Sequence, residues 1–251
     1  MAATGCGTLL PVASGRCRRA DIPIPMAPSP LRRMLESSAW ARALSAPDLD
    51  RVEAETQVRP CAAGGLVARK GDPVEHWIGV IDGLAKMASV SADGKPMSFT
   101  GLPSGAWFGE GSLLKDEPRR YDVVALRESS IALMPRATFL RLLETNFAFN
   151  RFIIVQLNER LAQFIGMIEH DRLLGPEARL ARSLAGLYNP VLYPGVGPQL
   201  PISQEELGQL VGLSRQRVNQ ALKCLETEGL LRVDYGGITV LDVGRLRGYG
   251  E

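Results

Sequence analysis

Two short helical segments joined by a single glycine constrain the fold of this chain more than any other feature. Ser203 precedes Gln204-Glu205-Glu206, which is the S-x-x-E pattern of a capping box at a helix start. Gly212 supplies a tight turn, and Ser214 caps a second helix that we expect to run to about Glu228. A hairpin turning at Gly236-Gly237 follows. Together these features predict a winged helix-turn-helix.

The second helix of this unit carries side chains suited to the edges of DNA bases. Such a helix enters the major groove by its first turns, where Arg pairs with guanine and Gln or Asn with adenine. Serines at helix starts suit phosphate oxygens. The predicted DNA contacts are Ser203, Ser214, Arg215, Gln216, Arg217, Asn219 and Gln220. The alternative is a polar face for protein contact, because residues 201–251 hold six basic and seven acidic groups.

The segment between Val58 and Met134 reads as short strands separated by turns at intervals of about 8–12 residues, as in an all-β sandwich or roll. Asp82-Gly83 predicts a hairpin with a two-residue turn, and a second hairpin is predicted to turn at Asp93-Gly94. Residues 31–55 have helical spacing.

One loop in this β-rich segment has the residues of an anion site. Gly109 and Gly111 bracket Glu110, and a short helix starts at or just before Ser112. Backbone N–H groups at such a turn favour an anion, and Arg120, ten residues after Glu110, could clamp a phosphate. A Gly-Glu-Gly turn with an internal Glu–Arg salt bridge would look the same, so both interpretations stay open.

A long helix is predicted over residues 147–174. Its apolar positions step by 4, 4, 3 and 4, which is close to a heptad repeat. They are Ile153, Leu157, Leu161, Phe164 and Ile168. A helix of about 28 residues spans about 42 Å, which exceeds what a small domain's core needs. We therefore expect the seam to pair with a second copy in a two-fold dimer; packing on the chain's own β segment is the alternative.

Composition narrows the function classes. The net charge of +2 permits a nucleic-acid partner without indicating one, and no apolar run is long enough for a membrane span. Four cysteines without a C-x-x-C pair and two isolated histidines argue against a disulfide framework, a metal or a haem site, and indicate a reducing cytoplasm. The sequence holds no catalytic triad pattern and no phosphate-binding G-x-x-x-x-G-K loop, so we expect no enzyme.

The chain from about residue 31 onward resembles the cyclic-AMP receptor protein/fumarate-nitrate regulator (CRP/FNR) superfamily. The resemblance is carried by Phe108-Gly109-Glu110 through Arg120 and by the stretch from Ile202 to Arg215. It implies an α+β protein with an N-terminal β-roll of the double-stranded β-helix or jelly-roll type, a long dimerisation helix and a C-terminal winged helix-turn-helix. The expected division is a disordered tail over 1–30, a sensor over 31–143, the dimer helix over 144–175 and the DNA unit over 176–251.

The same resemblance places a cyclic nucleotide in the roll, with Glu110 on the ribose and Arg120 on the phosphate. The implied ligand set is Gly109, Glu110, Gly111, Ser112, Arg120, Tyr121, Phe164 and Ile165. Tyr121 replaces a small hydroxyl residue, and apolar Phe164 and Ile165 stand where cyclic-AMP members carry a polar pair. An unpaired base edge costs about 1–3 kcal/mol, which argues against cyclic AMP. No cofactor is assigned with certainty.

We therefore expect a cytoplasmic homodimeric transcription regulator that binds a palindromic operator on double-stranded DNA, meets RNA polymerase and has no membrane contact. A cyclic nucleotide or another small anion in the roll would control it. The alternative is a ligand-independent regulator whose roll is only a scaffold. Arg215-Gln216 and Gln220 depart from the family's frequent Arg-Glu…Arg pattern, which predicts an altered half-site with a guanine contact kept at Arg215.

Overall fold

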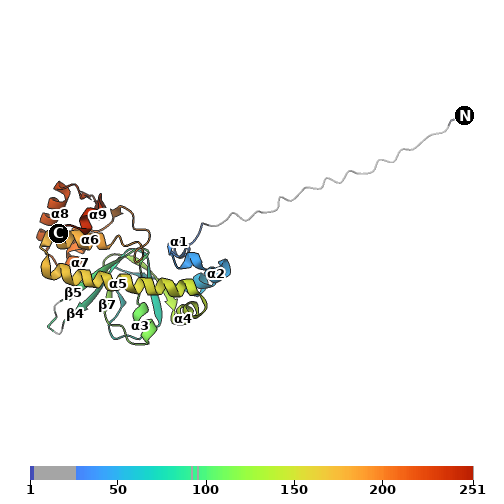
Figure 1. Ribbon diagram of the computed structural model, residues 1–251. Helices are drawn as coiled ribbons and strands as arrows, with labels where there is room; N and C mark the ends of the chain where they lie inside the picture. The colour runs from blue at the N-terminus through green and yellow to red at the C-terminus, as the bar shows by residue number, and fades with distance from the viewer. Residues whose placement is uncertain (3–26, 92, 95, 251) are drawn as a thin grey trace.

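A computed structural model describes residues 1–2, 27–91, 93–94 and 96–250 of the chain. Most of the predicted tail over 1–30 lies outside these residues, as do Cys6 and Cys17. The described chain is a β-roll, a long helix laid across it and a helical unit at the far end (Figure 1). The predicted α+β architecture is confirmed.

The elements of the roll and its flanking helices come first along the chain. They are α1 (Pro30–Ser37), the 3-10 turn η1 (Ala41–Ala43), α2 (Ala46–Glu55), β1 (Gln57–Cys61), β2 (Leu66–Ala68), β3 (His76–Asp82), β4 (Leu84–Val90), β5 (Pro96–Pro103), β6 (Trp107–Phe108), α3 (Glu110–Lys115), β7 (Asp122–Ala125), β8 (Ser129–Pro135) and α4 (Arg136–Thr145).

The long helix and the C-terminal unit follow. They comprise α5 (Phe147–Leu173), α6 (Pro176–Gly186), β9 (Gln199–Leu200), α7 (Gln204–Val211), α8 (Arg215–Thr227), β10 (Leu231–Asp234), β11 (Gly237–Val240) and α9 (Val243–Arg247).

The roll consists of two antiparallel sheets with strand orders β1-β8-β3-β6 and β2-β7-β4-β5. The predicted hairpin at Asp93-Gly94 is confirmed, because β4 pairs with β5 from Leu84↔Pro103 to Val90↔Pro96. The hairpin predicted at Asp82-Gly83 is wrong. There β3 belongs to the first sheet and β4 to the second, so this turn is a corner between sheets. Gly83 has φ 110°, and a Cβ would lie 2.2 Å from Ser129 Oγ, so glycine is required by the corner itself.

An aromatic cluster closes one end of the roll. All three tryptophans meet there, with Trp77 stacked on Trp107 at 4.5 Å and Trp40 edge-on to Trp107 at 5.5 Å. Phe149 from α5 packs edge-on against Trp40 at 5.4 Å. Aromatic pairs of this kind add about 0.5–1.5 kcal/mol beyond their buried area. The cluster therefore fixes the first turns of α5 on the roll.

The helix α5 runs across the roll from α4 to the C-terminal unit (Figure 1). Three of the five residues of the predicted seam lie on its inner face, against the roll. Ile153 is 2% exposed against the aromatic cluster, and Leu157 and Phe164 are half-buried on the roll. Of the predicted seam, only Leu161 and Ile168 are exposed. The predicted dimer seam is therefore wrong at three positions, because that part of the apolar repeat holds the helix on its own β-roll.

The C-terminal unit has its own core but also touches the roll. Leu84 of β4 is buried with the side chains of α6, α7 and α8. Arg127, between β7 and β8, donates two hydrogen bonds to Glu206 of α7, at 2.9 and 2.6 Å. Burial opposes the charge on Glu206, but the bonds from Arg127 and Ser203 hold its pKa below the ordinary value. The two units are thus joined by apolar contact and by one bidentate ion pair.

Candidate functional site

A cluster of charged and phenolic groups lies inside the roll, around the start of α3. Gly109 has φ 94°, a left-handed conformation that suits glycine, and it turns the chain so that the next residue, Glu110, points inward. Glu110 is only 3% exposed. Its Oε1 lies 3.8 Å from Arg160 Nε, and its Oε2 has no hydrogen-bond partner. A buried carboxylate oxygen without a donor is a costly feature of a folded protein and marks a place for a ligand donor.

Arg119, not Arg120, lies beside this carboxylate. The Arg119 side chain is buried and donates from Nη2 to the His76 carbonyl at 2.9 Å. A Cβ on Gly109 would lie 2.6 Å from Arg119 Nη1, so the glycine makes room for the guanidinium. Burial lowers the pKa of Arg119, and Glu110 is among the groups that oppose this shift.

Arg120, the predicted phosphate ligand, points outward. Its side chain is 71% exposed and forms an ion pair with Glu117 at 2.7 Å. The structure therefore does not bring Arg120 to Glu110. The prediction, which chose the arginine ten residues after the glutamate, selected the wrong one of two adjacent arginines. Arg119 is held inward by its bond to the His76 carbonyl, whereas Arg120 lies in a bend before β7 and is held outward by Glu117.

Tyr121, another residue of the predicted ligand set, interacts electrostatically with Glu110. Burial raises the pKa of its phenol to about 12, with a contribution from the Glu110 charge and opposing ones from Arg160 and Arg119. Gly111 and Ser112 belong to the first turn of α3, and nothing lies within 4 Å of a Cβ added at Gly111.

The two α5 residues of the predicted ligand set face different ways. Phe164 is half-buried against the roll core and meets Phe99 edge-on at 6.4 Å. Ile165 is 59% exposed on the outer side of the helix. Of these two residues, therefore, only Phe164 faces the interior of the roll.

Polar residues of α5 that the sequence reading missed complete the cluster. Arg160 donates from Nη2 to the Trp107 carbonyl at 2.9 Å, and Gln156 donates to the same oxygen at 3.3 Å. Burial disfavours the Arg160 charge, but Tyr193 and Glu110 offset this, and the Arg160 pKa stays above its ordinary value. A signal was present: Phe149, Ile153, Gln156 and Arg160 follow steps of 4, 3 and 4, so both polar residues share the buried face.

The helix-turn-helix has the geometry that the sequence predicts. Ser203 and Glu206 form a reciprocal capping box, Gly212 ends α7 with φ 66°, and Ser214 accepts from Arg217 N at 3.4 Å. Behind α8, β10 and β11 form the wing and β9 joins as a third strand. The side chains of Arg215, Gln216, Arg217 and Gln220 are exposed, and Asn219 is half-buried. In the described part of the chain, no hydrogen bond or ion pair engages the Arg215 or Arg217 side chain.

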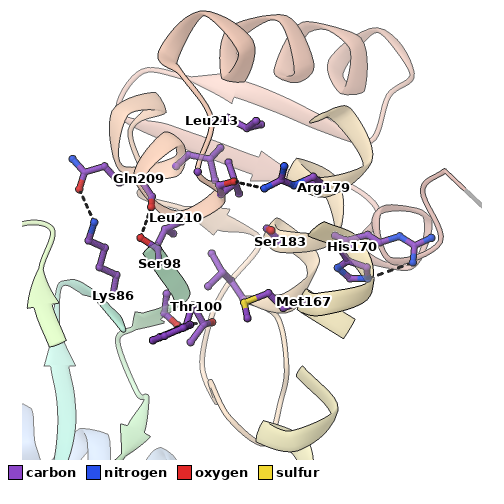
Figure 2. Close-up of a pocket in the computed structure, with 18 of the residues that line it drawn as sticks. Lys86, Ser98, Thr100, Met167, His170, Arg179, Ser183, Gln209, Leu210 and Leu213 are labelled. Atoms are coloured by element: carbon purple, nitrogen blue, oxygen red, sulfur yellow. Dashed lines mark hydrogen bonds between the residues drawn. The ribbon is translucent and has the colours of Figure 1, made fainter. Parts of the chain in front are cut away.

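A cleft of about 790 Å³ separates the roll from the helix-turn-helix (Figure 2). Its walls come from β5, α5, α6 and α7, and Gln209 bridges it by accepting from Lys86 Nζ at 3.3 Å and from Ser98 Oγ at its carbonyl, at 2.5 Å. Arg179 and His170 on the far wall also have protein partners. Because these groups are already bonded, while Glu110 Oε2 is not, the roll is the stronger candidate for a ligand site.

Other site types have no support among the residues that the structure describes. No group of three or more His, Cys, Asp or Glu side chains is arranged to hold a metal ion there. Cys61 is buried and Cys224 exposed, and both are free thiols. Within the same residues, no helix combines the length and apolarity needed to cross a bilayer.

Comparison with known proteins gives two family matches. Residues 58–146 match the family described as "Cyclic nucleotide-binding domain", and residues 178–249 match "Crp-like helix-turn-helix domain". The first match covers the roll with Glu110 and Arg119. The second covers the unit with Ser203, Ser214 and α8.

Two relatives align with this chain over most of its length and most of their own. The cAMP-activated global transcriptional regulator CRP of Haemophilus influenzae is 27% identical over 189 residues, which cover 74% of this chain and 84% of that protein. The cAMP-activated global transcriptional regulator Vfr of Pseudomonas aeruginosa is 29% identical over 192 residues, with 74% and 89% covered.

Solved structures share the fold. FixK2 from Bradyrhizobium japonicum superimposes with a TM-score of 0.64 at 17% identity, covering 77% of this chain and 96% of that one. The c-di-GMP responsive global regulator CLP of Xanthomonas campestris gives 0.55 at 24% identity, covering 79% and 100%.

Two neighbouring glycines provide a test of the turn at the site. Gly109→Ala should lower the free energy of unfolding by about 1–2 kcal/mol, because alanine is strained at positive φ and its Cβ would displace Arg119. Gly111→Ala, in open space on α3, should leave stability unchanged or raise it. Urea unfolding followed by tryptophan fluorescence measures both. Equal effects of the two substitutions would show that the turn imposes no special geometry.

Proposed function

Because this chain belongs to the CRP/FNR superfamily of DNA-binding transcription regulators, we propose that it acts as a homodimer on a palindromic operator, under the control of a small ligand in its roll. The protein is a regulator and not an enzyme. A regulator that binds DNA operates in the cytoplasm, where RNA polymerase is the expected further partner.

Sequence-specific DNA binding is supported by the first turn of α8, whose side chains are exposed and whose arginines have no protein partner among the described residues. Arg215, Gln216 and Arg217 are exposed on a helix whose start is fixed by the Ser214 cap and the Gly212 turn. A rigid helix with free guanidinium and amide groups at its N-terminal end suits base-edge contacts in the major groove. The Glu206 carboxylate of the preceding helix is paired with Arg127.

The outer face of α5 supports the homodimer. Four of its apolar side chains are 51–59% exposed and form a stripe with Asn158 between them, at steps of 4, 3, 4 and 3. This repeat fits the seam of a parallel coiled coil with one polar position, which fixes the register of the pair. The stripe is Ile154, Asn158, Leu161, Ile165 and Ile168. A second copy of the same stripe is its natural partner.

The polar cluster in the roll supports ligand control. Glu110 Oε2 lacks a donor, and Arg119 supplies a buried cation beside it. An anion that also carries a hydroxyl group would satisfy both, as a cyclic nucleotide does. The scaffold alternative draws on a different observation: Glu110 already has an ion pair with Arg160, which also bonds to Tyr193, and the Glu110 charge acts on the buried phenol of Tyr121.

Arg215→Ala tests operator reading. Loss of a bidentate guanine contact should cost about 1–3 kcal/mol of binding and relax preference at one base pair of each half-site. Selection from random duplexes, followed by titration at fixed salt, measures both. Arg151→Ala removes an equally exposed arginine from α5 and should bind as the unchanged protein does. If Arg215→Ala weakened binding to every duplex equally, Arg215 would contact phosphate only.

Leu161→Asp tests the dimer stripe. A charge at this 58% exposed position should give monomers that lose affinity for palindromic sites, because the carboxylates would face each other across the two-fold axis. Sedimentation velocity measures the oligomeric state. Val90→Asp, at an exposed apolar position on β4, is the control and should remain dimeric. An unchanged profile for Leu161→Asp would refute the stripe as the interface.

Two adjacent arginines test ligand control. A ligand at 100 times its Kd should add about 2.7 kcal/mol to the free energy of unfolding. We expect stabilisation by one of cyclic AMP, cyclic GMP or cyclic di-GMP in the unchanged protein and in Arg120→Gln, but not in Arg119→Gln. Differential scanning calorimetry measures it. If no nucleotide stabilised the unchanged protein, the roll would be a scaffold.

A further inference from the structure

The loop between α6 and β9 enters the roll. Tyr193 belongs to this loop, over residues 187–198, yet it is 1% exposed and packs in the core cluster between the two sheets. Leu192 is buried beside it to the same degree. The C-terminal unit therefore contributes an aromatic side chain to the interior of the domain that carries Glu110.

The Tyr193 hydroxyl is held by polar groups from both β5 and α5. It lies 3.3 Å from Thr100 Oγ1 and 3.2 Å from Gln163 Nε2, and Arg160 Nη1 donates to it at 3.4 Å. A buried phenol with three such partners is well satisfied. Burial of this kind indicates a built site for the ring and not an accidental contact.

The loop is shaped to deliver this ring. Asn189 Oδ1 accepts from the backbone N–H groups of Val191 and Leu192, and Asn189 Nδ2 donates to Glu159 of α5 at 2.8 Å. On the other side, the Pro194 carbonyl approaches Gly105 so closely that a Cβ there would lie 2.5 Å from it. The loop is thus clamped between α5 and the turn before β6.

Tyr193 and the Glu110 carboxylate share one guanidinium, that of Arg160. Arg160 lies 3.8 Å from Glu110 Oε1 through Nε and 3.4 Å from Tyr193 through Nη1. We propose that Tyr193 is the internal occupant of the ligand site and its specificity-determining residue. While it is seated, the site beside Glu110 and Arg119 is restricted to small anions, and a ligand that carries a nucleobase must expel the ring. This inference rests on the proposed ligand site in the roll.

Expulsion of Tyr193 would also move the DNA-reading unit. The loop joins α6 directly to β9, which pairs with the wing strand β11. A nucleotide and the seated loop therefore exclude each other, and their competition links ligand binding to the position of the helix-turn-helix.

The test measures cyclic AMP and cyclic GMP binding by isothermal titration calorimetry in the full chain. If the ring is seated in about nine-tenths of molecules, its removal should tighten binding about ten-fold. We expect this gain in Tyr193→Ala, a smaller one in Tyr193→Leu, and none in Tyr193→Phe, which keeps the ring. Tyr235→Ala, at a fully exposed tyrosine, is the control and should show no gain. Should Tyr193→Ala fail to fold, Tyr193→Leu decides.

Adding Arg119→Gln to Tyr193→Ala should abolish the gain, because the phosphate partner is then missing. A gain that persists in this double variant would place binding outside the roll and overturn the inference, as would binding no tighter than that of the unchanged protein. The two proposals fail differently. If only the Tyr193 variants bind, the inference holds and ligand control of the unchanged protein fails. If the unchanged protein binds through Arg119 and Tyr193→Ala adds nothing, ligand control holds and the inference fails.

Discussion

The buried guanidinium of Arg160 is the interaction on which the rest of this structure depends. A charge inside a protein is costly unless it is paired and hydrogen-bonded, so its partners cannot be removed independently. Those partners come from three parts of the chain: the Trp107 carbonyl on β6, Glu110 at the start of α3, and Tyr193 in the loop of the C-terminal unit. Because one side chain of α5 serves all three, the roll, the long helix and the DNA-reading unit are held in one arrangement by a shared electrostatic requirement.

A second attachment acts at a distance from the first. Arg127 and Glu206 join the corner of the roll to α7, and Glu206 also closes the capping box of that helix. The cleft of about 790 Å³ also lies between the roll and the C-terminal unit, and Gln209 bridges it. The units are therefore held together by these two charged attachments, by the bonds to Gln209 and by the apolar contact of Leu84. Such an arrangement allows the C-terminal unit to change position once one attachment is released, without unfolding either core.

The sequence predicted those parts of the fold that depend on local chemistry. The capping box at Ser203, the turn at Gly212 and the hairpin at Asp93-Gly94 are each determined by residues a few positions apart, and all are present. It failed where the outcome depends on distant partners. Asp82-Gly83 has the residues of a hairpin turn, but the pairing of β3 with β8 sends the chain to another sheet. Which of Arg119 and Arg120 points inward is decided by the His76 carbonyl, more than forty residues away. Tyr193 had no local signal at all, since its pocket is made by β5 and α5.

The two faces of the long helix explain why the predicted apolar seam was only partly right. The helix has an inner stripe, Phe149, Ile153, Gln156 and Arg160, and an outer stripe from Ile154 to Ile168. The two stripes are offset by only one or two residues along the sequence. A prediction from apolar spacing alone therefore mixes residues of both. The polar members distinguish them, because Arg160 serves the roll and Asn158 interrupts the outer stripe. One helix thus carries the polar cluster around Glu110 on one side and the proposed dimer contact on the other. A ligand that changed the partners of Arg160 would act on the same helix that, in the proposed dimer, sets the spacing of two DNA-reading units, and couplings of about 1–3 kcal/mol are typical of such shared elements.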